Sequence, residues 1–242
     1  DSLRDYVEGD DVRSIDWRAT ARRRSVVVRT WQPERDRRVV LVLDTSRTSA
    51  GRVGDIPRLD AAMDAALLLA ALASRAGDRV DFLAGDRWVR ARVAAAANRT
   101  TLLADLVQAM APLDPALVEA SWPALASAVS DITRRRALVV LLTPLEPAAI
   151  RESLLPTLAT LTRHYRVVLA SVSDPALDTM AATRETTADA YAAAAAERTL
   201  ALRESTAAML RRMGVDVVDG SPEQLPPRLA DHYLMLKATG QL

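Results

Sequence analysis

Two continuous runs of apolar residues stand out along the chain, over residues 39–43 and 137–142. Neither run alternates between apolar and polar positions, so each predicts a strand buried on both faces, as in a parallel sheet. We place these strands at 38–44 and 136–143. Shorter patterns predict five more strands, over residues 25–31, 79–84, 88–93, 166–172 and 215–218. The second and third of these five are expected to form a hairpin at Gly85-Asp86.

Helical periodicity fills most of the remaining chain. Residues 58–76 carry an apolar stripe that includes Leu59, Met63 and Leu67, and Gly77 gives this helix a suitable end. Five more helices are predicted, over residues 100–110, 122–133, 146–162, 186–213 and 222–237. Strands that alternate with helices predict an α/β fold of three layers, with a central, mostly parallel sheet and helices on both faces.

In such a fold, ligands bind at the carboxyl ends of the strands. The first fully apolar strand ends at Asp44, and Ser46 and Thr48 follow at positions two and four residues further on. One carboxylate and two hydroxyls at this spacing suit a hard divalent cation, and Mg²⁺ is our candidate. The alternative is structural: Asp44 caps the following turn, and the two hydroxyls satisfy backbone groups.

Composition excludes several classes of function. The 242 residues include no Cys, two His and a single Lys, Lys237, with a formal net charge of +1. These counts exclude disulfides, thiolate zinc sites, a cysteine nucleophile and a site of three His. A P-loop is excluded because its Lys must follow Gly. The longest apolar run, residues 65–73, is too short to span a bilayer.

The pattern after Leu43 resembles the metal-ion-dependent adhesion site of von Willebrand factor A (vWA) domains, which opens with D-x-S-x-S. Asp44, Ser46 and Thr48 match it, with Thr for the last Ser. The resemblance implies a vWA-like (Rossmann-like) fold and a binding module rather than a catalyst. The rest of the site departs from the family. Its second loop supplies a Thr, where residues 112–122 offer Ser121, and its third supplies an Asp, where this chain has Pro144. Thr143 and Glu146 are nearby substitutes, so the site is degenerate.

Residues 4–22 form a more specific motif, R-D-Y-V-E-G-D-D-V-R-S-I-D-W-R-A-T-A-R. It resembles the signature of the bacterial family called domain of unknown function 58, here of a high-GC actinobacterial type. The matched signature positions are Arg4, Tyr6, Gly9, Asp10, Arg13, Asp16 and Trp17. The match continues through Arg58-Leu59-Asp60 and residues 134–142. It covers essentially the whole chain.

This resemblance implies a vWA-like domain associated with a MoxR-type AAA+ ATPase. We therefore expect a non-catalytic protein-interaction module, a partner or adaptor of such an ATPase, with the signature residues as its docking surface. The alternative for the signature is a lattice of Arg–Asp ion pairs that ties this arm to the sheet. We expect residues 1–37 to form an N-terminal arm and residues 38–242 the vWA-like domain.

Two other functions are open. Asp44 could serve as the nucleophile of a Mg²⁺-dependent, phosphatase-like hydrolase, although Ser46 stands where such enzymes place a proton donor. The arginines of residues 22–24 and 35–38 could contact the phosphates of a nucleic acid, although acidic residues are interleaved among them. The composition favours a cytoplasmic domain. Full-length members of the resembled family commonly carry membrane helices upstream, which allows a membrane-anchored parent protein.

Overall fold

The structure is a computed structural model that describes residues 2–7, 10–23, 25–30, 37–95 and 101–242. The chain divides into two units, Asp1–Asp36 and Arg37–Leu242. This division falls one residue before the boundary that we predicted. Each unit is described by itself. In the described ranges, no helix is both long enough and apolar enough to cross a membrane.

Unit 1 is built on a two-stranded antiparallel sheet. Strand β1 (Ser2–Asp5) pairs with β2 (Val27–Thr30), which lies within the strand predicted at 25–31. Between them lie a 3₁₀ turn, η1 (Val12–Ser14), and a short helix, α1 (Trp17–Arg23). Asp16 caps this helix, because its carboxylate accepts hydrogen bonds from the backbone N–H groups of Arg18 and Ala19 at 3.1 and 3.0 Å.

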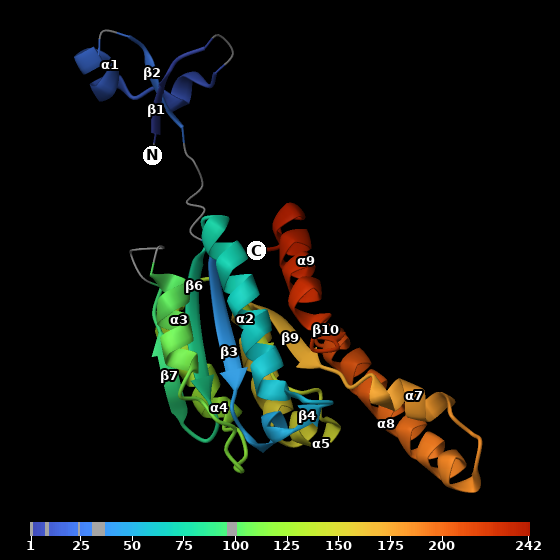
Figure 1. Ribbon diagram of the computed structural model, residues 1–242. Coiled ribbons are helices and arrows are strands. Elements are labelled where there is room, and N and C mark those ends of the chain that lie inside the picture. The colour runs from blue at the N-terminus through green and yellow to red at the C-terminus, as the bar shows by residue number, and fades with distance from the viewer. Residues whose placement is uncertain (1, 8–9, 24, 31–36, 96–100) are drawn as a thin grey trace. The chain divides into compact units, whose positions relative to one another are not determined.

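Unit 2 contains a six-stranded sheet with the strand order β10-β9-β8-β3-β6-β7 (Figure 1). All neighbouring pairs are parallel except β6 and β7, which form the predicted hairpin. The strands are β3 (Arg38–Asp44), β6 (Arg79–Gly85), β7 (Val89–Val93), β8 (Leu138–Leu142), β9 (Arg166–Val172) and β10 (Val215–Gly220). The two fully apolar runs, β3 and β8, lie side by side at the centre, where both faces of a strand are covered.

Successive residues of β3 contribute to two separate cores. Val39, Leu41 and Leu43 pack against α2 (Arg58–Arg75), α3 (Leu102–Met110) and α9 (Leu225–Ala238). Val40 and Val42 pack on the other face, against α4 (Trp122–Ile132), α6 (Leu155–His164) and α8 (Thr187–Arg212). Helices therefore cover both faces of the sheet, and the predicted three-layer α/β fold is confirmed.

Strand β1, helix α1 and the small β4–β5 hairpin at residues 52–57 were not predicted, and two segments after β8 also differ from the predicted elements. The single helix expected over residues 146–162 is divided into α5 (Pro147–Ala149), a π-helical segment η3 (Ile150–Leu154) and α6. Pro156, in the first turn of α6, has no N–H to donate and crowds the carbonyl four residues earlier, which favours a local widening of the helix. The second difference is α7 (Ala176–Ala182), a helix in a segment for which we predicted none.

The loop after β3 is short and ordered. It contains a 3₁₀ turn, η2 (Arg47–Ala50), and a small hairpin of β4 (Arg52–Val53) and β5 (Ile56–Pro57) before α2 begins. The backbone of this loop is tied to the segment before α4, since Ala116 N–H donates to the Thr45 carbonyl at 2.7 Å and Arg47 N–H to the Val118 carbonyl at 3.0 Å. These bonds place two loops from distant parts of the sequence at the same edge of the sheet.

Candidate functional site

Asp44 is the last residue of the central strand β3, and its side chain is buried with only 1% exposed. The register pairs Leu43 with Leu142, so Asp44 lies beside Thr143, the residue that follows β8. The carboxyl ends of parallel strands meet at one edge, which is why two residues so distant in sequence become neighbours. The topology therefore builds the site that the sequence pattern after Leu43 indicates.

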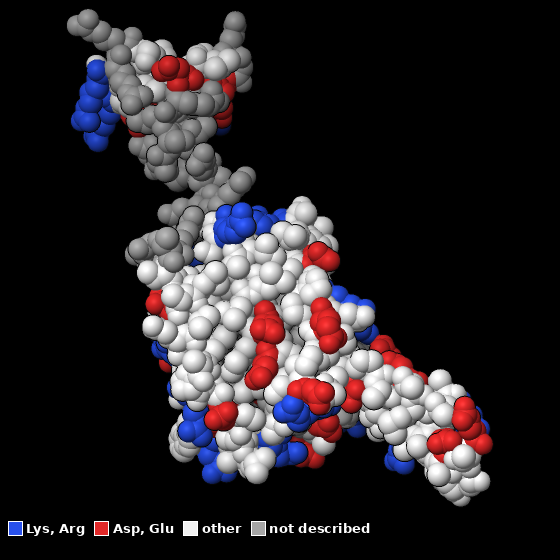
Figure 2. All heavy atoms as spheres, viewed as in Figure 1, with Lys and Arg blue, Asp and Glu red and all other residues white. Residues whose placement is uncertain are grey.

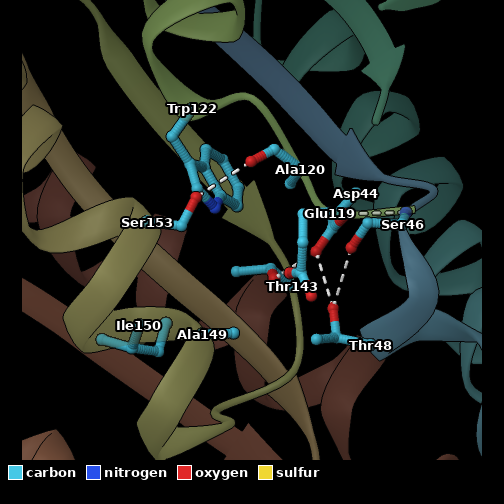
Figure 3. A pocket seen from close by; sticks show the side chains of 10 residues that line it. All are labelled: Asp44, Ser46, Thr48, Glu119, Ala120, Trp122, Thr143, Ala149, Ile150 and Ser153. Atoms are coloured by element: carbon cyan, nitrogen blue, oxygen red, sulfur yellow. Dashed lines mark hydrogen bonds between the residues drawn. The ribbon is translucent and has the colours of Figure 1, made fainter. Parts of the chain in front are cut away.

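Three hydroxyl side chains surround the Asp44 carboxylate (Figure 3). Its Oδ2 accepts a hydrogen bond from Thr48 Oγ1 at 3.0 Å and another from Thr143 Oγ1 at 2.6 Å. Its Oδ1 accepts the Ser46 backbone N–H at 2.8 Å, and the Ser46 Oγ lies 3.1 Å from Thr48 Oγ1. The structure thus brings together the predicted Asp44, Ser46 and Thr48, and with them Thr143, one of the two substitutes considered near Pro144.

A narrow pocket opens at this cluster. Its volume is about 10 Å³, which is room for one water molecule. Besides Asp44, Ser46, Thr48 and Thr143, its lining consists of Glu119, Ala120, Trp122, Ala149, Ile150 and Ser153. The last three come from α5 and η3, so the π-helical segment forms one wall (Figure 3).

Ser121, our further candidate ligand, is not among the residues that line the pocket, and its role as a ligand stays a prediction. The residue immediately precedes α4, and its backbone N–H donates to the Asp86 carbonyl at 2.9 Å. This bond fixes the segment so that the two preceding residues, Glu119 and Ala120, line the pocket instead. Of the two substitutes near Pro144, Thr143 belongs to the lining, whereas Glu146 is exposed and lies outside it.

Glu119 is a pocket residue that the sequence motif did not identify. Its side chain lies at the pocket with more than half of its surface exposed, and its carboxylate pairs with the Nε of Arg47. The side-chain hydrogen bond from Arg47 to Glu119 and the charge of Glu119 raise the pKa of Arg47 above its usual range. A carboxylate and a guanidinium therefore stand together beside the buried Asp44.

The residues present fit a hard divalent cation. The donor set is one carboxylate and three hydroxyls, all oxygen ligands of the kind that Mg²⁺ takes together with water. Each hydroxyl that now donates a proton keeps lone pairs that can face a cation. Within the described part of the chain, no group of three or more His, Cys, Asp or Glu could hold a metal ion, so binding here would depend on the hydroxyls.

The signature residues all belong to unit 1. Arg4 lies in β1, and Gly9 falls outside the described residues. Asp10 closes a turn, since its carboxylate accepts the Val7 N–H at 3.0 Å, and Asp16 caps α1 as described above. The side chains of Tyr6, Arg13 and Trp17 are exposed, Trp17 by 67%. Their role as a docking surface stays a prediction.

Asp86, buried at the end of the β6–β7 hairpin, is held by ionic and polar contacts. Arg90 Nε donates to it at 2.8 Å, the Trp88 N–H at 3.1 Å and the Thr45 hydroxyl at 3.3 Å. Burial raises the pKa of Asp86, but the hydrogen bonds from Arg90 and Trp88 outweigh it and leave the pKa below its usual range.

This lowered pKa predicts a pH-dependent stability. Ionised Asp86 stabilises the fold above its ordinary pKa of 3.8, and the stabilisation is lost as the pH falls through the lower folded value. We expect Asp86→Asn to reduce the free energy of unfolding by about 1–2 kcal/mol at pH 7, and by much less near pH 2. Urea unfolding at both pH values measures the two differences. The exposed Asp64→Asn is the control, and a penalty for Asp86→Asn that is independent of pH would contradict the prediction.

Comparisons with known proteins give a family and several structural neighbours. No curated protein matches the chain. The PilB minor pilin from Streptococcus sanguinis, as its D319A mutant, is 13% identical with a TM-score of 0.48, and the match covers 88% of this chain and 64% of the pilin. The SpRpn10 VWA domain is 13% identical with a TM-score of 0.45, over 82% of this chain and 94% of that domain. BatB from Bacteroides thetaiotaomicron, a conserved hypothetical protein, is 11% identical with a TM-score of 0.49, and the match covers 83% of this chain and 99% of BatB.

The family model described as "Protein of unknown function DUF58" matches residues 2–183. The matched range contains all of unit 1 except Asp1, including the signature residues, and, in unit 2, every residue that lines the pocket around Asp44. The match covers most of the chain and agrees with the family that the signature indicated, so the chain belongs to the DUF58 family.

Proposed function

We propose that this chain is a non-catalytic protein-interaction module, and that its pocket around Asp44 holds a divalent cation through which it binds an acidic side chain of a partner. The observation that carries the proposal is the convergence of the Thr48 and Thr143 hydroxyls on one buried carboxylate, with the Ser46 hydroxyl in reach of Thr48. These groups come from two loops that only the folded sheet brings together. Asp44, Ser46, Thr48 and Thr143 are the residues that would hold the cation.

A bound cation supplies positive charge at the pocket, and a partner carboxylate is the natural ligand for that charge. The protein contributes a second positive charge, the guanidinium of Arg47. Arg47 pairs with the pocket residue Glu119, and about half of each side chain is exposed. An incoming carboxylate can therefore replace Glu119 beside Arg47. This exchange replaces the Arg47–Glu119 pair by a pair between Arg47 and the partner's carboxylate, so no charge pair is lost. We therefore expect the site to be specific for acidic side chains.

The surroundings of Asp44 favour binding over hydrolysis. Ser46 stands where a phosphatase of this kind places its proton donor, so the group needed for general acid catalysis is missing at that position. Both Asp44 oxygens already accept hydrogen bonds and the residue is buried, which is unfavourable for a nucleophile. Asp44 is thus better suited to hold an ion than to attack a substrate.

The structure also bears on the basic stretch that suggested nucleic-acid binding. Arg38 belongs to that stretch, but its guanidinium donates to buried Asp81 at 2.6 Å and to the Ile132 carbonyl at 3.0 Å. A side chain that is used inside the fold in this way contributes little to a phosphate-binding surface. This observation argues against Arg38 as a phosphate contact, and Arg24 and Arg35 of the same prediction lie outside the described residues.

We further propose that the partner is a MoxR-type AAA+ ATPase. The support for this step is the family membership of the chain together with the association that the signature resemblance implies. The test is co-purification of the full chain with a MoxR-type AAA+ ATPase, in Mg²⁺ and in EDTA. Asp44→Asn keeps the size of the side chain and removes its charge, and the exposed Asp64→Asn is the matched control.

We expect the ATPase to be retained by the wild type and by Asp64→Asn in Mg²⁺. EDTA or Asp44→Asn should abolish this retention. Equal retention by a correctly folded Asp44→Asn protein would remove the pocket from the interaction. If the wild type does not retain the ATPase under any condition, the choice of partner is wrong.

A further inference from the structure

Helices α7 and α8 form a hairpin, part of which projects beyond the sheet (Figure 1). The C-terminal half of α8 packs on the sheet, where Ala207 and Leu210 are buried in the core. The N-terminal half packs against α7 and buries only two small side chains, Ala193 and Ala196. Two helices that bury so little apolar surface are weakly stabilised by each other. This projecting segment therefore gains stability from any additional packing.

A groove runs between the two helices of this hairpin. Its volume is about 320 Å³, and its residues are Ala176, Thr179, Met180, Thr183, Asp189 and Ala192. Three of these residues, Ala176, Thr179 and Met180, come from α7 and share one helical face, and Thr183 follows directly after the helix. The lining therefore combines one face of α7, continued by Thr183, with residues of the first turns of α8.

The polar groups along the groove are largely satisfied within the hairpin. The Thr183 hydroxyl donates to the Thr179 carbonyl at 2.9 Å. Asp189 and Thr186 form a capping box at the start of α8, in which the Asp189 carboxylate accepts the Thr186 N–H at 2.8 Å. What remains for an occupant is mainly methyl and thioether surface from Ala176, Met180 and Ala192. The groove is thus suited to apolar side chains.

Large apolar side chains are also exposed on the hairpin. Met180 is 44% exposed within the groove, and Tyr191 on α8 is 77% exposed. A flexible Met in a groove adapts to different apolar partners, and an exposed Tyr offers a large contact area with a polar end. Both features are typical of a surface that becomes covered when a partner binds.

The charge around the groove is negative. Acidic residues precede, flank and line it: Asp174, Asp178, Glu185 and Asp189. Arg184, the basic residue in the same stretch, pairs with Glu197. Figure 2 shows acidic side chains gathered on the projecting end of the hairpin. A partner for this groove therefore needs apolar side chains with positive charge beside them.

We infer that the α7–α8 groove is a docking site for an amphipathic helix of a partner protein, with apolar side chains on one face and Lys or Arg at its flanks. A helix laid into a groove between two helices presents apolar residues at positions i, i+3, i+4 and i+7, which is the spacing of the α7 residues that it meets. The acidic rim then pairs with the basic flanks. This site uses none of the residues of the Asp44 pocket, so it stands independently of the proposed function.

The test uses the full chain and a fluorescently labelled 18-residue helical peptide, with Leu on one face and Lys on the other. Fluorescence anisotropy gives its dissociation constant. Met180→Lys places a positive charge in the groove and removes the thioether, and we expect it to weaken binding at least tenfold. The matched control is Leu117→Lys, which alters another exposed apolar residue, 84% exposed and outside the groove. It should bind as the wild type does.

Two further measurements examine the role of charge at the groove and the identity of its occupant. A peptide with Glu in place of Lys should not bind, and the double variant Asp178→Asn, Glu185→Gln should weaken binding of the Lys peptide and reduce its dependence on salt. Failure of the Lys peptide to bind, or binding that Met180→Lys leaves unchanged, overturns the inference. So does a dimer in sedimentation that Met180→Lys dissociates, because the occupant would then be a second copy of this chain.

Discussion

Asp44→Asn is expected to abolish the stabilisation of the chain by Mg²⁺. A cation that binds only the folded state at 100 times its dissociation constant adds about 2.7 kcal/mol to the free energy of unfolding. For a chain of this size, that corresponds to a rise in Tm of roughly 5–10 °C. Asn keeps an oxygen for the Ser46 N–H but loses the charge that holds the cation, so the rise should disappear.

The measurement is a thermal unfolding series of wild type and variant with increasing Mg²⁺, and with EDTA as the reference. Asp86→Asn is the matched control, because it removes another buried carboxylate from the same edge of the sheet but outside the pocket lining. It should be less stable throughout and still respond to Mg²⁺. A wild type that does not respond, or an Asp44→Asn protein that responds equally, would show that the hydroxyl cluster only satisfies hydrogen bonds.

Phe82→Ala is the substitution with the largest expected effect on stability. Phe82 is the only Phe in the chain, is fully buried, and lies on β6 opposite Leu41 of the central strand. It fills the core between the sheet and helices α2 and α3, where many of the surrounding side chains are Ala and Leu. Small neighbours cannot move in to fill the space, so we expect a loss of about 3–5 kcal/mol.

A loss of this size is a large part of the 5–15 kcal/mol that typically holds a domain folded, and it lowers Tm by roughly 6–20 °C. Urea unfolding followed by circular dichroism measures the change. Phe82→Leu keeps most of the volume and should lose clearly less. If the Ala and Leu variants were equally stable, the core around Phe82 would have to be more adaptable than its packing indicates.

The strands could be predicted because burial on both faces leaves a direct mark on the sequence. The run around Leu41 has no polar residue to mark a solvent face, and only a central strand tolerates this. The helix at residues 58–75 was equally clear from its stripe and from Gly77. The elements that the sequence did not reveal include β1 and α1 of unit 1, the π-helical segment before Pro156, and the short helix α7, which has no buried side chain to show a period.

Only the part of the candidate site at the end of β3 and just after it could be predicted from the sequence. Asp44, Ser46 and Thr48 are close in sequence, so their spacing alone brings them together. The other wall depends on how a loop from before α4 lies across the sheet edge, and a shift of two residues exchanges Ser121 for Glu119. The hydrogen bond from the Ser121 N–H to the Asp86 carbonyl sets this register. Both groups belong to the backbone, so the identities of the side chains do not reveal the bond.

The position of β3 between β6 and β8 has a consequence for how the chain folds. Asp44 and Thr143 are 99 positions apart, so the last neighbour of the central strand emerges late during synthesis. Contacts between such distant segments must close a long loop and form slowly. Until then, one edge of β3 has no partner and can pair with another chain. A nascent chain that ends before β8 should therefore be prone to aggregate.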